Sequence, residues 1–282
     1  MREKNINKGS NGSKKMSMSA ETKACLKFLK AGIVLGAVLM VIVFIVALLI
    51  ARAVRPEELE VVAKSTPVKK LERLHGIDIS SHQKNYIEVI ASRGATCDFV
   101  VMRATEGYEV DSRCDPAYQY AKERGLLLGV YFWGNPVELD PVDYADFCKS
   151  MVEGYLGEAI MTLDFEPRNH ESLNPEWARL WLEEFERVSG VKPLIYMNSY
   201  VATHLDWSSV IDGGYKIWVA SYGEDDGRTT LGNMGAWTGN VAMFQYTTCG
   251  LGGRETLDLD IFFGSRDDWV LLAARNPSKN PG

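Results

Sequence analysis

Residues 159–167 read Ala-Ile-Met-Thr-Leu-Asp-Phe-Glu-Pro, an apolar run that ends in two acids one residue apart. Side chains on a strand alternate between its two faces, so Asp164 and Glu166 point to one side and Phe165 to the other. Pro167 has no N–H and tends to stop a strand, which places both acids at the C-terminal end. Two carboxylates at one strand end suit acid-catalysed cleavage of a glycosidic bond, although acids are also common at solvated strand ends.

Seven further apolar runs of strand length surround this one, and helical patterns fill several of the gaps. The predicted strands are Gly76–Ile79, Asp98–Arg103, Leu126–Phe132, Ala159–Phe165, Lys192–Met197, Tyr215–Ala220, Asn240–Tyr246 and Thr256–Phe262. The predicted helices are Tyr86–Arg93, Pro116–Arg124, Pro141–Tyr155, Pro175–Ser189 and Tyr200–Ile211, whereas residues 223–239 show no helical pattern. Alternating strands and helices predict an α/β fold with parallel strands, and eight strands indicate a (β/α)8-like barrel.

Three of these helices carry a recognisable start signal. A proline stands where the first turn begins, and a residue that can cap the helix precedes it: Asp115 before Pro116, Asp140 before Pro141 and Asn174 before Pro175. Glycines at 94, 125 and 190 are placed to end helices.

The charge of the chain is unevenly distributed. Residues 1–30 contain eight Lys or Arg against two acids, so their net charge is +6. Because the whole chain has a net charge of −6, the remainder has a net charge of −12. An acidic body argues against nucleic acid as its partner but not against a neutral polymer. At 46% hydrophobic and 24% charged, the composition is that of a folded globular protein.

The cysteines and histidines show no metal-ligand spacing, so we expect no metal and no other cofactor. Four cysteines fall in the body: Cys97, Cys114, Cys148 and Cys249. They permit one or two disulfides outside the cell, but their apolar neighbours favour buried thiols.

A stretch without any charged residue, 31–51, is long enough to cross a bilayer as a helix. Lysines at 14, 15, 23, 27 and 30 precede it, which predicts that the N-terminal side is cytoplasmic. A cleaved signal peptide is the competing interpretation, but its apolar core is usually only about 7–15 residues long. The favoured interpretation is therefore a single-pass anchor in the cell membrane with an extracytoplasmic body.

The predicted organisation follows from these patterns. Residues 1–30 form a basic cytoplasmic tail, 31–52 a transmembrane helix, 53–74 a stalk, 75–270 the barrel and 271–282 a C-terminal tail.

Polar and aromatic residues recur where the predicted strands end. In a (β/α)8 barrel the C-terminal strand ends form the functional face, so these residues are expected to meet there. Each alone has a structural explanation, but together they suit a carbohydrate. The acids are Asp78, Asp164, Glu166 and Asp258, and the expected substrate-binding residues are Arg103, Glu106, Tyr131, Tyr196, Trp218, Tyr222, Gln245 and Asp260.

From about His75 to Trp269 the sequence resembles the glycoside hydrolase family 25 muramidases, the Chalaropsis-type lysozymes. The matching stretches are 76–83 (GIDISSHQ), 99–107 (FVVMRATEG), 129–132 (GVYF), 163–166 (LDFE), 217–222 (IWVASY), 244–246 (FQY) and 257–260 (LDLD). Any one of them is weak evidence, but all of them occur in the family's order. One departure is Phe132, where many members carry His, which affects the expected detail of one sugar subsite.

The resemblance implies a flattened, irregular barrel that cleaves the β-1,4 bond between N-acetylmuramic acid and N-acetylglucosamine in peptidoglycan. It implies Glu166 as the general acid, Asp164 as its partner, and Asp78 and Asp258 as further acids on the groove floor. Asp164 would stabilise an oxocarbenium ion or orient the substrate's N-acetyl group. Two alternatives stay open: a peptidoglycan-binding module without catalysis, and a hydrolase of another extracellular glycan.

Overall fold

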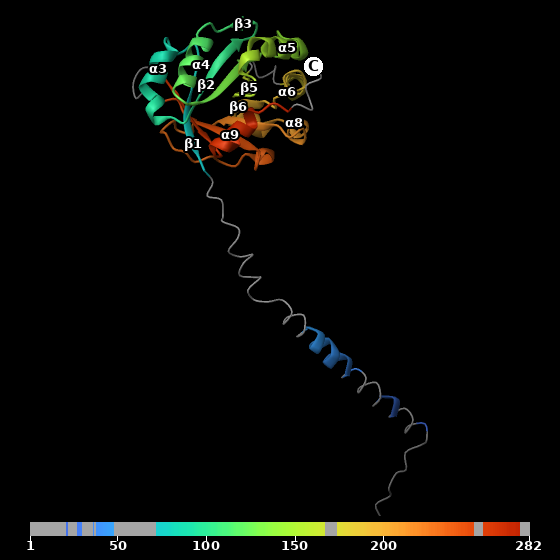
Figure 1. Cartoon of the computed structure of the whole chain (residues 1–282). Coiled ribbons are helices and arrows are strands. Elements are labelled where there is room, and N and C mark those ends of the chain that lie inside the picture. Colours follow the sequence, from blue (N-terminus) through green and yellow to red (C-terminus); the bar gives the residue numbers. More distant parts are fainter. Residues whose placement is uncertain are drawn as a thin grey trace, which may run out of the picture. The chain divides into compact units, whose positions relative to one another are not determined.

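The computed structural model describes residues 72–166, 174–250 and 256–276, together with 21, 27–29, 36 and 38–47. The chain divides into two compact units, Met1–Lys69 and Lys70–Gly282. The second unit holds the strands shown in Figure 1. They are β1 Leu74–Ile79, β2 Phe99–Glu106, β3 Glu109–Val110, β4 Leu127–Trp133, β5 Ala159–Asp164, β6 Leu194–Asn198, β7 Lys216–Ala220, β8 Val241–Thr247 and β9 Asp258–Phe262.

Eight of these strands close into a barrel. Their order is β1-β9-β8-β7-β6-β5-β4-β2, and pairing of β1 with β2 completes the ring. All eight predicted strands are present, and the prediction of an α/β barrel is confirmed. The prediction of an all-parallel barrel is wrong for its last member, because β9 runs antiparallel to both β1 and β8. The short β3, which was not predicted, forms a hairpin with β2.

The direction of β9 follows from its connection to β8. A parallel neighbour needs a crossover, usually a helix, whereas an antiparallel neighbour can follow directly. No helix stands between β8 and β9 in the described residues, and β9 pairs with β8 from Leu259 to Phe262 as it returns. The first residue of β9 therefore lies at the same barrel end as the last residues of the parallel strands.

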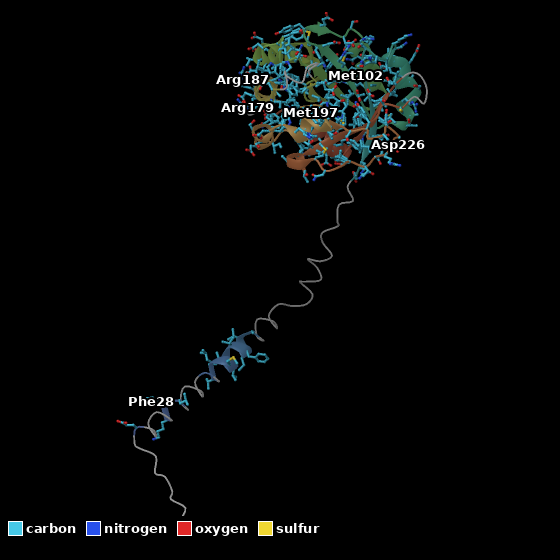
Figure 2. The ribbon with its side chains drawn as sticks, turned by 180° about the vertical axis from the view of Figure 1, so that it is seen from behind. Phe28, Met102, Arg179, Arg187, Met197 and Asp226 are labelled. Carbon is cyan, nitrogen blue, oxygen red and sulfur yellow. The ribbon has the colours of Figure 1, made fainter. Side chains whose placement is uncertain are left out.

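The barrel has one layer of apolar side chains inside and another outside, as the alternation along β2 shows. Val101 belongs to the inner cluster with Tyr131 and Trp218. Its neighbours Val100 and Met102 belong to the outer cluster, which packs under the surrounding helices. Figure 2 shows two arginines at the outer surface, Arg179 and Arg187, which form ion pairs with glutamates of their own helix.

The surrounding helices are α3 Tyr86–Arg93, α4 Cys114–Glu123, α5 Pro141–Met151, α6 Pro175–Ser189, α7 Ser199–His204, α8 Ser208–Asp212 and α9 Arg266–Ala273, with 3₁₀ turns at Gly94–Thr96, Glu153–Tyr155 and Gly235–Trp237. The starts of α5 and α6 are confirmed, with Asp140 and Asn174 as their N-caps. The predicted start of α4 is wrong, since this helix begins two residues before Pro116 and Asp115 is not its cap. Residues 223–239 contain only the last of the 3₁₀ turns, as their lack of a helical pattern indicated.

The helix predicted over Tyr200–Ile211 is two short helices in the structure. Leu205 is extended and separates α7 from α8. This break lets Trp207 turn into the core, where it is 1% exposed and its indole N–H donates to the Val201 carbonyl at 3.0 Å. Burial of a large aromatic side chain outweighs the few backbone hydrogen bonds that a continuous helix would add.

Helix α9 closes the barrel end opposite the C-terminal strand ends. Trp269 packs on Phe99 and Phe262 with ring centroids 4.6 and 5.1 Å apart, and its indole N–H donates to the Leu128 carbonyl. Helix α9 ends at Ala273, and the Asn276 N–H donates to the Gly190 carbonyl. The folded domain thus continues past the predicted boundary at residue 270.

Replacing Asp140 with Ala is expected to lower the free energy of unfolding by about 1 kcal/mol. The Asp140 carboxylate accepts the N–H groups of Val142 and Asp143, which have no partner inside helix α5. Asp140→Asn keeps an accepting oxygen and is the matched control. Denaturant unfolding of both variants measures the difference, and equal losses would show that the cap contributes nothing.

The N-terminal unit is described only in part. Residues 38–47 are helical with exposed apolar side chains. Among the residues that the structure describes, no helix has the length and apolar character needed to span a membrane. Apart from residue 36, the rest of the predicted span 31–52, and the stalk 53–74 up to residue 71, lie outside the described residues.

Candidate active site

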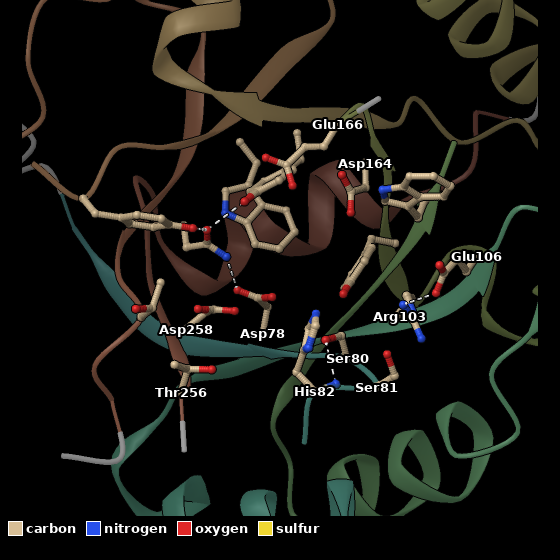
Figure 3. Close-up of a pocket in the computed structure, with 17 residues that line it drawn as sticks. Asp78, Ser80, Ser81, His82, Arg103, Glu106, Asp164, Glu166, Thr256 and Asp258 are labelled. Carbon is tan, nitrogen blue, oxygen red and sulfur yellow. Dashed lines mark hydrogen bonds and ion pairs between the residues drawn. The ribbon is translucent and has the colours of Figure 1, made fainter. Parts of the chain in front are cut away.

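An open cavity of about 570 Å³ lies at the C-terminal ends of the parallel strands. Figure 3 shows Glu166 and Asp164 on one side of it, with Asp78 and Asp258 on the other. All eight strands of the barrel contribute to its lining, which consists of Asp78, Ser80, Ser81, His82, Arg103, Glu106, Tyr131, Trp133, Asp164, Glu166, Tyr196, Trp218, Tyr222, Gln245, Thr248, Thr256 and Asp258. All predicted site residues except Asp260 are therefore brought together here.

The two acids of the opening stretch lie as the alternation predicts. Asp164 is the last residue of β5, and both it and Glu166 line the cavity. Phe165 points the other way and packs on Trp177 and Trp207 with ring centroids 6.2 and 5.6 Å apart. This buried aromatic contact fixes the strand end and therefore the direction of both carboxyl groups.

Asp78 and Asp258 face each other across neighbouring strands. They are paired in the register of β1 with β9. Asp78 lies near the end of β1, and Asp258 is the first residue of β9. Because β9 is antiparallel, its beginning lies beside the end of β1, so both acids belong to the cavity.

Hydrogen bonds orient Asp78 from inside the barrel. The Gln245 amide N–H donates to Asp78 Oδ2 at 2.5 Å. The Gln245 carbonyl oxygen accepts the hydroxyl of Tyr196 at 2.8 Å and also the hydroxyl of Tyr222. Two donors on its oxygen leave Gln245 only its NH₂ group for Asp78, so the glutamine cannot be reversed without losing these bonds.

Glu166 is one of the carboxyl groups in the cavity that can hold a proton near neutral pH. Burial beside the cavity wall raises the pKa of Glu166 to about 7, and the negative charge of Asp78 adds to this. The pKa of Asp164 is also well above its ordinary range, because of burial and the charges of Glu166 and Asp78. Arg103 opposes this and favours ionised Asp164.

The pKa values of Asp78 and Asp258 are also raised, that of Asp78 to below and that of Asp258 to above the value of Glu166. Burial raises the pKa of Asp78 to about 6, but hydrogen bonds from Gln245 and Asp260 limit the rise. Burial raises the pKa of Asp258 to about 8, and the charges of Asp78 and Asp225 contribute. Carboxyl groups whose pKa values are spread in this way divide into proton donors and anions near neutral pH.

Arg103 is the only arginine or lysine among the described residues that line the cavity. Its guanidinium donates to Glu106 at 2.7 Å and lies 3.5 Å from Asp111. Asp111 is held in turn by Arg113 and by the Tyr86 hydroxyl. These partners fix Arg103 and Glu106 at the rim as a preformed polar edge.

Asp225 ties the two loops beside the cavity together. It is the only described non-glycine residue with a positive φ, at 52°. Its carboxylate accepts hydrogen bonds from the Thr247 hydroxyl, the Thr248 hydroxyl and N–H, and the Cys249 thiol. These bonds lower the pKa of Asp225 to about 2 and hold Thr248 in the wall.

Two expectations about individual residues are wrong. Asp260 was expected to bind substrate, but it is fully buried and does not line the cavity. Phe132 was expected to affect a sugar subsite, but it points outward and packs on Trp181 and Phe185 with centroids 5.7 and 5.5 Å apart. Alternation along β4 turns Tyr131 and Trp133 inward and Phe132 toward helix α6.

Several lining residues were absent from the predicted set: Ser80, Ser81, His82, Trp133, Thr248 and Thr256. Trp133 could have been found, because it stands two residues after Tyr131 and shares its face. Ser80, Ser81 and His82 follow β1 directly. Thr248 and Thr256 flank the connection between β8 and β9, and only the direction of β9 brings this connection to the cavity.

The four described cysteines are free. Cys114 and Cys148 are buried as expected, whereas Cys97 is partly exposed and Cys249 is exposed, so the expectation of four buried thiols is only half right. No group of three or more His, Cys, Asp or Glu is placed to hold a metal ion anywhere in the described part of the chain.

The barrel is similar to solved structures of muramidases and lysozymes. A muramidase structure from Trichobolus zukalii superposes with a TM-score of 0.56 at 24% identity, covering 71% of this chain and 98% of that chain. A bacterial lysozyme from Streptomyces coelicolor gives 0.56 at 22% identity, covering 71% and 96%. A family GH25 lysozyme from Aspergillus fumigatus gives 0.54 at 22% identity, covering 72% and 100%. At these identities the likeness establishes the shared fold.

Sequence comparison adds the family. The curated "Uncharacterized protein YegX" of Escherichia coli O157:H7 is 31% identical over 156 residues, which cover 53% of this chain and 56% of that protein. The match thus spans about half the length of this relative. The profile of Glycosyl hydrolases family 25 matches residues 77–251, which include Asp78, Asp164 and Glu166. Because that match covers more than half of the 282 residues, the chain belongs to family 25 of the glycosyl hydrolases.

Proposed function

We propose that this protein is a peptidoglycan hydrolase of the muramidase type, which cleaves the β-1,4 bond between N-acetylmuramic acid and N-acetylglucosamine. The observation that carries the proposal is the set of four acids around an open cavity of about 570 Å³ in a family 25 barrel. Tyr131, Trp133, Tyr196, Trp218 and Tyr222 supply aromatic surface in the same cavity. Aromatic faces for the C–H surfaces of a sugar and acids for its hydroxyls are what a glycan site requires.

Glu166 acts as the general acid. Its raised pKa, about 7, lets it carry a proton in the pH range in which Asp78 is ionised. It gives that proton to the leaving glycosidic oxygen, which lowers the barrier to breaking the bond. No metal or organic cofactor is needed for this step.

Asp164 stabilises the positive charge that develops at the sugar carbon when the glycosidic bond breaks. It either stabilises the oxocarbenium-like transition state directly or holds the substrate's N-acetyl group as an internal nucleophile. The positive charge of Arg103 lowers the pKa of Asp164 and so opposes the effects of burial and of the neighbouring acids. The rate of cleavage of walls from which the N-acetyl groups have been removed distinguishes the two roles, because only the second role requires the acetyl oxygen.

The direct test is digestion of purified peptidoglycan by the full-length protein in detergent. Products are reduced with borohydride and identified by mass spectrometry. Products whose reduced end is N-acetylmuramic acid support the proposal. Products whose reduced end is N-acetylglucosamine would contradict the assigned bond. Binding to peptidoglycan without any product would instead identify a non-catalytic binding module.

The rate of cleavage is expected to be greatest between about pH 6 and 7. Asp78, with a pKa of about 6, must be ionised, so the rate rises as pH increases through that value. Glu166, with a pKa of about 7, must be protonated, so the rate falls as pH increases further. These carboxyl groups interact, so the two limbs of a kcat/KM profile report the cluster rather than single residues. A profile that is flat across this range would exclude this pairing of acid and anion.

We further propose that residues 31–52 anchor the protein in the cell membrane, with residues 1–30 in the cytoplasm and the barrel outside. The uncharged run 31–51 and the lysines before it support this arrangement. A tethered muramidase would cut only wall near the membrane, which suits wall remodelling or local wall penetration more than free lysis. Cell fractionation with protease digestion of intact spheroplasts tests it, and protein free in the culture medium would contradict it.

A further inference from the structure

Asp260 lies inside the barrel, one layer below the acids of the cavity. Its side chain is fully buried, and it is two residues from Asp258, so both point into the barrel. Across the strand pair it stands opposite Gly76, which has no side chain. Asp78 stands two residues further along β1 on the same face, so its carboxyl group is the nearest acidic neighbour on that strand, and each of the two carboxyl groups affects the pKa of the other.

The remaining surroundings of Asp260 do not support a negative charge. Its Oδ1 accepts the indole N–H of Trp218 at 2.8 Å. Its Oδ2 finds no N–H or O–H donor within the described residues. A buried carboxylate with one neutral donor and another carboxylate beside it is strongly disfavoured, and taking up a proton removes the penalty.

Asp78 has the opposite surroundings. The Gln245 amide N–H is directed at its Oδ2, and the hydroxyls of Tyr196 and Tyr222 prevent that amide from turning over. Asp78 is also 5% exposed, at the edge of the open cavity. Donors and access to water both favour the ionised form. Of these two carboxyl groups, Asp260 is thus suited to hold the proton and Asp78 the charge.

We infer that Asp260 is a positioning residue that holds a proton and donates it in a hydrogen bond to Asp78, keeping Asp78 ionised and directed at the cavity. One proton is shared by two carboxyl groups, and no covalent bond is made or broken. The inference rests on the proposed function only in assigning Asp78 to the reaction. The shared proton itself is measurable without any substrate.

The other titratable groups near this pair come from all sides of the barrel. Those that face it are Asp258 on β9, Asp164 and Glu166 at the end of β5, Tyr131 on β4, Tyr196 on β6 and Tyr222 after β7, and Tyr246 lies on the outer face of β8. Burial raises the pKa of each of these phenols, so they remain neutral. The nearby charges that vary with pH are therefore those of carboxyl groups, and they oppose ionisation of Asp260.

The first test is infrared difference spectroscopy of the full-length protein in detergent at about pH 7, comparing the wild type with Asp260→Asn. Asn has nearly the same shape, accepts from Trp218 through its oxygen and donates to Asp78 through its NH₂ group. The expected result is loss of one carbonyl stretch of a protonated carboxylic acid. Loss of carboxylate bands instead would show that Asp260 is ionised and would overturn the inference.

The second test compares the pH profiles of Asp260→Asn and Asp260→Ala. Alanine removes the donor, so ionised Asp78 loses stabilisation and its pKa rises. The acid limb of the kcat/KM profile, which is the rise in rate as Asp78 ionises, should therefore move to higher pH by about one unit. Asparagine restores a donor and should return the limb toward its wild-type position. A role in packing alone would lower the melting temperature without moving the limb, so an unmoved limb in folded Asp260→Ala contradicts the inference.

Failure of the inference and failure of the proposed function give different results. If the wild type cuts no peptidoglycan but the infrared band disappears in Asp260→Asn, the shared proton stands and the muramidase proposal falls. If the wild type cuts peptidoglycan but the band is unchanged, the proposed function stands and the positioning role falls.

Discussion

Replacing Glu166 with Gln is expected to slow peptidoglycan cleavage at least about a hundredfold, the lower range for loss of a general acid. Glutamine has the size of glutamic acid but no proton to give to the leaving oxygen. The loss should fall on kcat more than on KM, because the proton is transferred only in the transition state. Release of reducing ends from purified walls measures the rate.

Glu123→Gln is the matched control for this experiment. It makes the same chemical change at an exposed position of helix α4, far from the lining of the cavity. Its rate should equal that of the wild type. Substantial turnover by Glu166→Gln, under conditions in which both variants are folded, would remove Glu166 from the role of general acid.

Replacing Asp164 with Asn is expected to cost about a hundredfold or more in rate, the effect of removing a group that stabilises developing charge. The amide keeps the shape of the side chain at the end of β5 but cannot carry the negative charge. If Asp164 orients the N-acetyl group, the loss should be smaller on walls that lack this group, which the enzyme already cuts poorly. Rates on both wall preparations measure the difference, and an active Asp164→Asn would exclude both roles.

The same variant should be more stable than the wild type. Burial and neighbouring charges raise the pKa of Asp164 in the folded protein well above its ordinary value. Over the pH range between these two values the folded state holds a proton that the unfolded chain has released, so stability falls as pH rises through that range. The amide introduced by Asp164→Asn does not titrate, and the variant should gain about 1 kcal/mol at neutral pH. Thermal unfolding at acidic and neutral pH should show a gain at neutral pH that shrinks toward acidic pH.

Local patterns in the sequence were sufficient for most of the strands and for the paired acids. Period-two alternation places Asp164 and Glu166 on one face because it depends only on the backbone of one strand. The caps of α5 and α6 were predictable for the same reason, since a cap bonds N–H groups two or three residues away. The two-helix structure of residues 199–212 was not, because the burial of Trp207 depends on the core above it.

The sequence by itself determined that this chain forms an α/β barrel, and that acids and aromatic residues gather where its strands end. Only the tertiary structure decided which of those residues reach the cavity. Asp258 reaches the cavity because β9 is antiparallel. If β9 were parallel, its first residue would lie at the opposite end of the barrel. Asp260, two residues later, is instead buried under Asp78. Strand direction and depth depend on pairing between segments far apart in the chain, and no local pattern of side chains specifies such pairing.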